Sequence, residues 1–467
     1  MTSQSAPPTE GRSIIRALLA LAWPVILSRA TQAVIGFSDA LLVAPLGEAA
    51  LAAVTTGALN AFTVMILPIG TVFIVQSFAA QLRGRGELEA VRRYAWYALA
   101  LAAVSAVVAA AAIPFVPALV GRLGYAPEVT RDMTTYVSIR LLSVGGAIGM
   151  EAIGNWYGGL GNTRVSMVAS VVAMVVNVLG CLVLIQPRFG LPGFGVAGAA
   201  WASVLASWLG FATTAVAFRR GLGAPDGVAA APMGRLRMRE LRRMLRFGLP
   251  NGINWFLEFA AFVAFINVVV GKLGTVTLAA FNVVMQINSL GFMPAFGLAS
   301  AGAILVGEAI GRRAHDEVWP IVRATAVFAM GWMLSLGLVY FAAPRALVGL
   351  FHVPSSNDDA FLVIGAQMLS FAVFWQLFDA LNMTLSEALR AAGDTTWCMW
   401  TRIVIAWLVF TPIAWSLVLY LHGGVVTVMA SLIGYLALLS GAFALRFAGG
   451  KWRSIELVEE GPSVVDS

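Results

Sequence analysis

The stretch from Asn254 to Val270 reads NWFLEFAAFVAFINVVV, an aromatic and aliphatic run that contains a single carboxylate, Glu258. Extended back to about Leu245, this run is long enough to cross a hydrocarbon core of about 30 Å as an α-helix. A charged side chain at that depth costs free energy on every hydrophobicity scale, so a partner or a function must compensate for it. Glu258 is therefore the first candidate for a functional residue.

The whole chain has the composition of an integral membrane protein. Its 467 residues are 60% hydrophobic and 11% charged, and the mean hydropathy is +0.85. A soluble protein of this length would expose too much apolar surface. Because lipid offers no hydrogen-bond partners to the backbone, uncharged runs of about 20 residues predict helices. The predicted fold class is all-α, and the run that begins at Ile14 is too long for a signal peptide and is expected to stay in the membrane.

Few residues suit catalysis or metal binding. Cys181 and Cys398 lie in or beside apolar runs and are interpreted as small apolar side chains. His315, His352 and His422 lack the spacing of metal ligands. We therefore expect no enzyme, no metal and no cofactor. The net charge of +7 comes from arginines between apolar runs, so it indicates membrane topology and no nucleic-acid partner.

Breaking the sequence at charged or Gly/Pro-rich joints gives twelve candidate transmembrane spans. They cover residues 14–43, 49–80, 93–119, 132–158, 164–186, 194–218, 243–270, 277–306, 319–350, 360–389, 397–420 and 424–446. Arginines concentrate in the even joints, with Arg390 and Arg402 counted among them, and are sparser in the odd joints. This bias predicts that the even joints and both termini face the cytoplasm.

A polar joint rich in Gly, Pro and Arg, from Arg219 to Arg243, divides the spans into six and six. The halves resemble each other: Pro24 and Pro250 each lie early in the first span of a half, and PLGEAALAA (45–53) matches KLGTVTLAA (272–280). An even number of spans in each half predicts a parallel repeat about an axis along the membrane normal. The predicted domains are an amino-terminal tail (1–13), a six-helix bundle (14–220), a cytoplasmic linker (221–242), a second bundle (243–446) and a carboxyl-terminal tail (447–467).

Several motifs resemble one transporter family over nearly the whole chain. LAWPVILSRATQAVIGFSD, LPNGINWFLE and LRAAGDTT are similar to segments of the multidrug and toxic compound extrusion (MATE) family, most of all its NorM-like branch. That branch carries acids in the first, seventh and tenth spans, and here Asp39, Glu258 and Asp379 fill these positions. A second branch, DinF-like, has a fifth-span acid where this chain has Cys181, four residues after Asn177. The resemblance implies cation-driven export of amphipathic organic compounds, and the departure at Cys181 argues against an amino-terminal proton site.

The intramembrane polar residues divide into two candidate groups. Glu258, Asp379 and Asn254 are the expected coupling-cation site, because Asn254 lies one helical turn before Glu258 and acids inside membranes commonly mark ion paths. The expected cation or substrate cavity comprises Asp39, Gln32, Gln286, Asn282 and Asn177. The alternatives are a core acid neutralised by a hydrogen bond at Glu258, a headgroup-level position for Asp39, and helix–helix hydrogen bonding for the amides of the eighth span.

Arg29 is a cation near the middle of the first span. Either it pairs with an acid on another helix or its guanidinium reaches the cytoplasmic interface, and the sequence leaves both open. Glu151 in the fourth span has no counterpart in the motifs of the family. The roles of both residues are undecided by sequence.

The resulting hypothesis is a secondary active multidrug exporter of a bacterial-type inner membrane that works by alternating access. The coupling ion is Na⁺ or H⁺, and the NorM-like set of acids favours Na⁺. Expected partners are drugs, dyes, cationic metabolites and membrane lipids, and the expected state is a monomer. The alternative function is a lipid-linked saccharide flippase or another solute exporter of the same superfamily. A flippase needs a cavity with several fixed cations, of which Arg29 alone supplies little.

Overall fold

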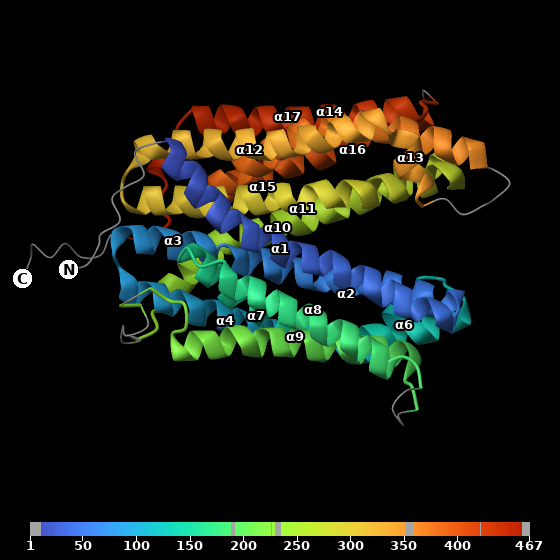
Figure 1. Ribbon diagram of the computed structural model, residues 1–467, viewed down its shortest axis with the longest axis horizontal. Coiled ribbons are helices and arrows are strands. Elements are labelled where there is room, and N and C mark those ends of the chain that lie inside the picture. The colour runs from blue at the N-terminus through green and yellow to red at the C-terminus, as the bar shows by residue number, and fades with distance from the viewer. Residues whose placement is uncertain are drawn as a thin grey trace, which may run out of the picture. The chain divides into compact units, whose positions relative to one another are not determined.

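The computed structural model describes residues 11–187, 192–225, 227–228, 235–351, 358–420 and 422–459, and every regular element in these ranges is helical (Figure 1). Within them, 11 helical stretches are long and apolar enough to cross a membrane. The remaining predicted span corresponds to α10 (Met238–Ala264), whose first turns carry a cluster of charges that includes Arg239 and Glu240. The all-α fold with twelve membrane helices in two bundles is confirmed. Arg188, the arginine of the joint between the fifth and sixth predicted spans, and His352 lie outside the described residues.

The chain forms two compact units, Leu27–Ile253 and Met1–Ile26 with Asn254–Ser467, here called unit 2 and unit 1. The division differs from the predicted bundles, 14–220 and 243–446, in two helices. α1 (Gly11–Val43) changes unit after Ile26, and α10 changes unit after Ile253. The physical reason is packing: Leu18 and Ala22, in the first half of α1, are buried in a cluster of unit 1. A boundary drawn at the linker assumes that each helix packs within one bundle over its whole length.

Unit 2 contains the second part of α1 and the helices of the first half of the chain. These are α2 (Glu48–Phe73), α3 (Val75–Arg85), α4 (Leu88–Ala112), α5 (Val116–Gly121), α6 (Pro127–Arg140), α7 (Val144–Gly159), α8 (Arg164–Leu184), α9 (Gly195–Arg220) and the first part of α10. Small residues let these helices approach closely. A Cβ atom on Gly198 would lie 2.3 Å from the Leu184 carbonyl oxygen, so glycine is needed where α9 meets the end of α8.

Unit 1 contains the first part of α1 and the helices from the second part of α10 onward. These are α11 (Thr275–Gly311), α12 (His315–Ala342), α13 (Pro344–Gly349), α14 (Asp358–Ala392), α15 (Thr395–Ile403), α16 (Thr411–Leu419) and α17 (Val425–Ala448). The predicted ninth span, 319–350, is too long: α12 ends at Ala342, and Pro344 starts the separate helix α13 because its ring suits a first helical position. Two π-helical segments, η4 (Phe265–Val269) and η6 (Val404–Phe410), follow α10 and α15.

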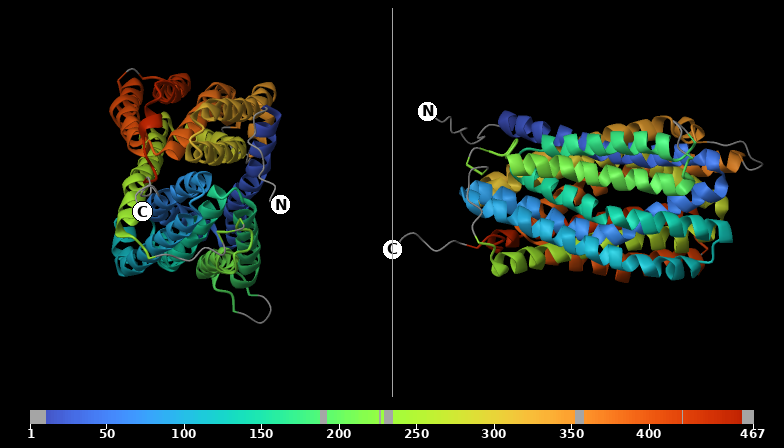
Figure 2. Two further views of the ribbon diagram at one scale, coloured as in Figure 1. Left: turned by 90° about the vertical axis from the view of Figure 1, so that its left-hand side faces the viewer. Right: turned by 90° about the horizontal axis from the view of Figure 1, so that it is seen from below.

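Within each unit the helices run side by side (Figure 2). In unit 2, Trp156 Nε1 donates to the Val91 carbonyl oxygen at 2.8 Å, and Asn162 Nδ2 donates to that of Gly223 at 2.7 Å. In unit 1, Ile14 packs against the cluster that contains Phe447 and Trp452. The alternation that the arginine pattern requires is therefore present in each unit.

Candidate functional site

An ion pair lies within the membrane helices of unit 1. Arg402 Nη1 on α15 contacts Glu258 Oε1 on α10, and the side chain of Arg402 is 5% exposed while that of Glu258 is 46% exposed. The pair therefore joins a buried guanidinium to a carboxylate that is about half exposed. The assignment of Arg402 to an even joint was wrong, because α15 begins at Thr395 and places Arg402 two turns inside the helix.

Asp379 lies close to this pair. It is half-buried on α14 and within range for charge–charge interaction with both Glu258 and Arg402. Tyr435 on α17 lies within the same range of these three groups. Unit 1 thus pairs Glu258 with Arg402 and places Asp379 within electrostatic range of both. Two members of this group, Arg402 and Tyr435, were missed from the sequence.

Two buried amides provide unused oxygen acceptors on the same helices. Asn254, 8% exposed, lies one turn before Glu258, and Asn382, 3% exposed, lies three residues after Asp379. Neither Oδ1 atom has a hydrogen-bond donor among the described residues. Since buried polar atoms are normally paired, these two oxygens are candidates to contact a bound cation or compound.

The two amides that were predicted as cavity residues in the eighth span do not lie in a buried site. Asn282 and Gln286 are exposed on α11. The amide–amide contact of this helix uses the partly buried Asn288, whose Oδ1 accepts a hydrogen bond from Nε2 of the buried Gln376 at 2.9 Å. Helix–helix hydrogen bonding, one of the alternatives for this span, therefore occurs at Asn288, which was not among the predicted residues.

Unit 2 has a second polar cluster, built around the carboxylate of Asp39. Asp39 on α1 is 9% exposed and accepts a hydrogen bond from Cys181 Sγ on α8 at 3.2 Å. Asn177 Nδ2 donates to Ser203 Oγ at 3.1 Å, and both residues lie next to Asp39. The interpretation of Cys181 as a purely apolar side chain was wrong, because the packing of α8 places its weak S–H donor against a carboxylate. Gln32 is exposed.

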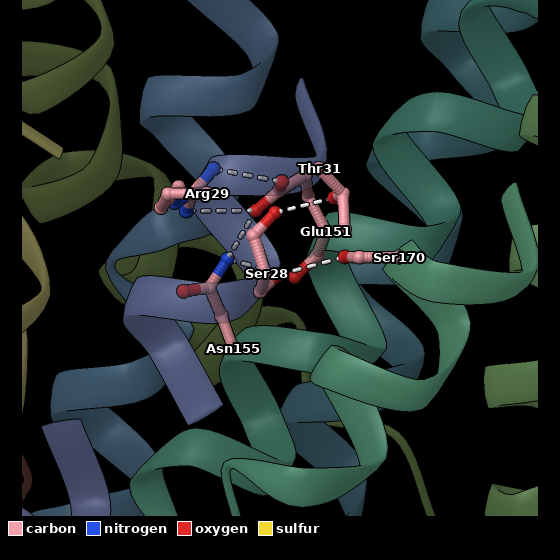
Figure 3. A network of polar contacts seen from close by, with 6 residues as sticks. All are labelled: Ser28, Arg29, Thr31, Glu151, Asn155 and Ser170. Atoms are coloured by element: carbon pink, nitrogen blue, oxygen red, sulfur yellow. Dashed lines mark hydrogen bonds and ion pairs between the residues drawn. The ribbon is translucent and has the colours of Figure 1, made fainter. Parts of the chain in front are cut away.

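A polar network on the same half of α1 contains Arg29 (Figure 3). Arg29 Nη1 and Nη2 donate to the two carboxylate oxygens of Glu151 on α7 at 3.1 and 3.4 Å. Asn155 Nδ2 donates to the Glu151 carbonyl oxygen at 2.7 Å, and the hydroxyls of Ser28 and Ser170 lie 2.7 Å apart. Of the two alternatives that the sequence left open for Arg29, the structure shows the pair with an acid on another helix. Arg29 and Glu151 neutralise each other, so this pair adds no net charge to unit 2.

Comparisons with known proteins identify relatives over nearly the full length. A family model described as MatE matches residues 24–183 and 252–416. A probable multidrug resistance protein NorM of Pseudomonas putida is 30% identical over 468 residues, covering 97% of this chain and 96% of the relative. One of the same name from Deinococcus radiodurans is 31% identical over 417 residues, covering 88% of this chain and 89% of the relative.

Solved structures share the fold at lower sequence identity. A MATE in complex with MaL6 has a TM-score of 0.84 at 20% identity, over 96% of this chain and 100% of that chain. The eukaryotic MATE transporter AtDTX14 has a TM-score of 0.83 at 15% identity, over 95% of this chain and 98% of that chain. These two likenesses concern the fold.

Proposed function

The chain belongs to the MatE family, and from this premise we propose that it is a secondary active exporter of amphipathic, often cationic organic compounds. The printed names of the Pseudomonas and Deinococcus relatives, probable multidrug resistance protein NorM, support drugs and dyes as the substrate class. As a multi-pass membrane protein with bacterial relatives, it acts in the plasma membrane of a bacterium, with both termini in the cytoplasm as the arginine pattern predicts.

The observation that carries this proposal is the group formed by Glu258, Asp379 and Arg402 within membrane helices of unit 1. Two carboxylates at such a position are costly to a purely structural protein. In an exporter, they bind a cationic compound in one state and a coupling cation in the other. Each ligand must bind the two states with different affinity, since otherwise one gradient cannot drive the other.

The coupling ion is Na⁺ or H⁺, and we retain Na⁺ as the working hypothesis. The free oxygens of Asn254 and Asn382 are hard donors of the kind that Na⁺ prefers, which supports it. Two neighbouring carboxyl groups can instead share one proton. The gradient experiment given in the Discussion distinguishes the two ions.

Export is favoured over the flippase alternative by the state of two intramembrane arginines, Arg29 and Arg402. Arg29 pairs with Glu151, and Arg402 pairs with Glu258. A site for a lipid-linked pyrophosphate needs cations whose charge is available to the ligand. Each of these guanidinium groups is already neutralised by a carboxylate, so they favour a cationic substrate over an anionic one.

An efflux assay in a pump-deficient bacterium tests the proposed function. Cells that express the wild type should accumulate less ethidium and survive higher fluoroquinolone concentrations than cells with an empty vector. Glu258→Gln should lose most of this protection. The matched control is Glu317→Gln at the α11–α12 joint. It removes an acid whose Oε2 lies 2.8 Å from Arg312 Nη2. Equal protection by wild type and Glu258→Gln would remove Glu258 from the mechanism, and no protection by the wild type would contradict drug export.

A further inference from the structure

Arg402 is held firmly in the candidate site of unit 1. Its side chain is 5% exposed, it is paired with Glu258, and its guanidinium carbon lies 5.8 Å from the centroid of the fully buried Phe443 ring. Burial against an aromatic ring favours a guanidinium over an ammonium group, which is more strongly hydrated. The position of this positive charge is therefore fixed by packing as well as by the ion pair.

The neighbouring charges in unit 1 cancel in pairs. Arg446 Nε contacts Asp394 Oδ2 at 2.7 Å, and Arg390 is paired with Glu387 three residues earlier on α14. With both carboxyls ionised, Glu258, Asp379 and Arg402 together carry one negative charge in excess. The electrostatic character of the site is therefore set by these three groups and would be doubly negative without Arg402.

We propose that Arg402 is a resident counterion that sets the net charge of the site at minus one and thereby selects compounds with a single positive charge. This inference rests on the proposed function and adds a specificity-determining residue to it. One monovalent cation, whether the coupling ion or the transported compound, neutralises the site. A dication would leave an uncompensated positive charge beside the buried guanidinium of Arg402, and an unpaired charge is costly next to buried groups.

One N–H group of Arg402 is not used in the ion pair. Its Nε atom is buried and has no acceptor among the described residues, so its contact with Glu258 does not use the full donor set of the guanidinium. The spare N–H can bond to Asp379 or to an oxygen of a bound compound. Arg402 can therefore stay in the site while a ligand binds and does not have to leave as a displaced ion would.

Binding of two matched probes to the full-length protein in lipid nanodiscs tests the proposal. The probes are tetraphenylphosphonium, with one positive charge, and a bis(triphenylphosphonium) alkane, with two. The wild type should prefer the monocation. Arg402→Gln should shift the ratio of the two dissociation constants toward the dication by about tenfold or more, since one further negative charge then faces the ligand. Arg312→Gln removes an arginine at the α11–α12 joint and should leave the ratio unchanged.

A charge rescue keeps the test decisive if Arg402→Gln does not fold. Glu258→Gln alone leaves no net charge and should lose monocation binding, whereas Glu258→Gln combined with Arg402→Gln restores one negative charge and should regain it. An unchanged ratio in Arg402→Gln, or no rescue in the double variant, would overturn the counterion role while leaving export intact. A wild type that binds neither probe would contradict the proposed function itself.

Discussion

Glu240 holds the start of α10 against α4 through several hydrogen bonds. Its replacement by glutamine is therefore expected to lower the free energy of unfolding. Arg93 Nε and Nη2 donate to the Glu240 carboxylate at 2.8 and 2.7 Å, and the Tyr97 hydroxyl donates to it at 2.8 Å. That hydroxyl also accepts a hydrogen bond from the Arg237 backbone N–H at 2.7 Å. A single carboxylate thus ties α4 to the segment that leads out of the linker.

The burial of the pair sets the expected magnitude. The side chains of Arg93 and Glu240 are only 9% and 14% exposed. Removing one partner of a buried ion pair costs about 3–5 kcal/mol, because the remaining charge is left uncompensated. Glutamine still accepts one hydrogen bond, so we expect Glu240→Gln to lower the free energy of unfolding by about 3 kcal/mol. Tyr97→Phe removes the hydrogen bond to the Glu240 carboxylate and the one accepted from the Arg237 N–H, so it should cost about 2–3 kcal/mol.

Reversible unfolding in mixed micelles, titrated with sodium dodecyl sulfate and followed by tryptophan fluorescence, measures these differences. The control is Asp132→Asn, because Asp132 pairs with Arg131 at 3.3 Å and the side chain of Arg131 is 78% exposed. Such a pair contributes at most about 1 kcal/mol. If Glu240→Gln is no more destabilising than Asp132→Asn, the assignment of a buried, stabilising ion pair is wrong. Adding Arg93→Met to Glu240→Gln should recover part of the loss, because no unpaired charge then remains.

Three further predictions concern topology and coupling. A cysteine at Gly227, in the predicted cytoplasmic linker, should not react with an impermeant thiol reagent added to intact cells, and labelling from outside would reverse the topology. Asp379→Asn should abolish ion-driven efflux more completely than Asp39→Asn, because the paired intramembrane acids lie in unit 1; the opposite order would place coupling in unit 2. In everted vesicles that contain a fluorescent cation, a Na⁺ gradient alone should drive movement of that cation with the pH gradient collapsed. Transport that needs no Na⁺ and stops with a protonophore would identify H⁺ as the coupling ion.

The spans and the two central acids could be predicted because a charge inside an apolar run is visible in the sequence alone. Glu258 and Asp379 have this property. Arg402 does not, since it follows the joint residues Gly393 and Asp394 by less than ten positions and therefore resembles an interfacial arginine. The predicted span 397–420 contains Arg402 only five residues from its start, whereas α15 begins directly after Asp394, so Arg402 lies about 10 Å along the helix axis.

The contacts between residues of different helices could not be predicted from the spacing of residues in the sequence. Periodicity places residues on a face of their own helix, but it does not identify the face of another helix that lies opposite. The bond between Cys181 and Asp39 joins α8 to α1, and the bond between Gln376 and Asn288 joins α14 to α11. Each depends on how two helices pack, and a small polar residue in an apolar run gives no indication of that.

The π-helical segment η6 lets one membrane span combine an ionic group with an apolar contact surface. A π-helical bulge contains about one residue more than an α-helix needs, so the face presented after it is turned by about 100°. Before η6, Arg402 is directed at Glu258; at its end, Phe410 stacks on Tyr435 with ring centroids 4.7 Å apart, and Ala414 is buried in the hydrophobic core. Deleting one residue from 404–410 would restore a regular helix and turn one of these two faces away from its partner. The number of residues in 404–410 therefore matters more for this span than their hydrophobicity.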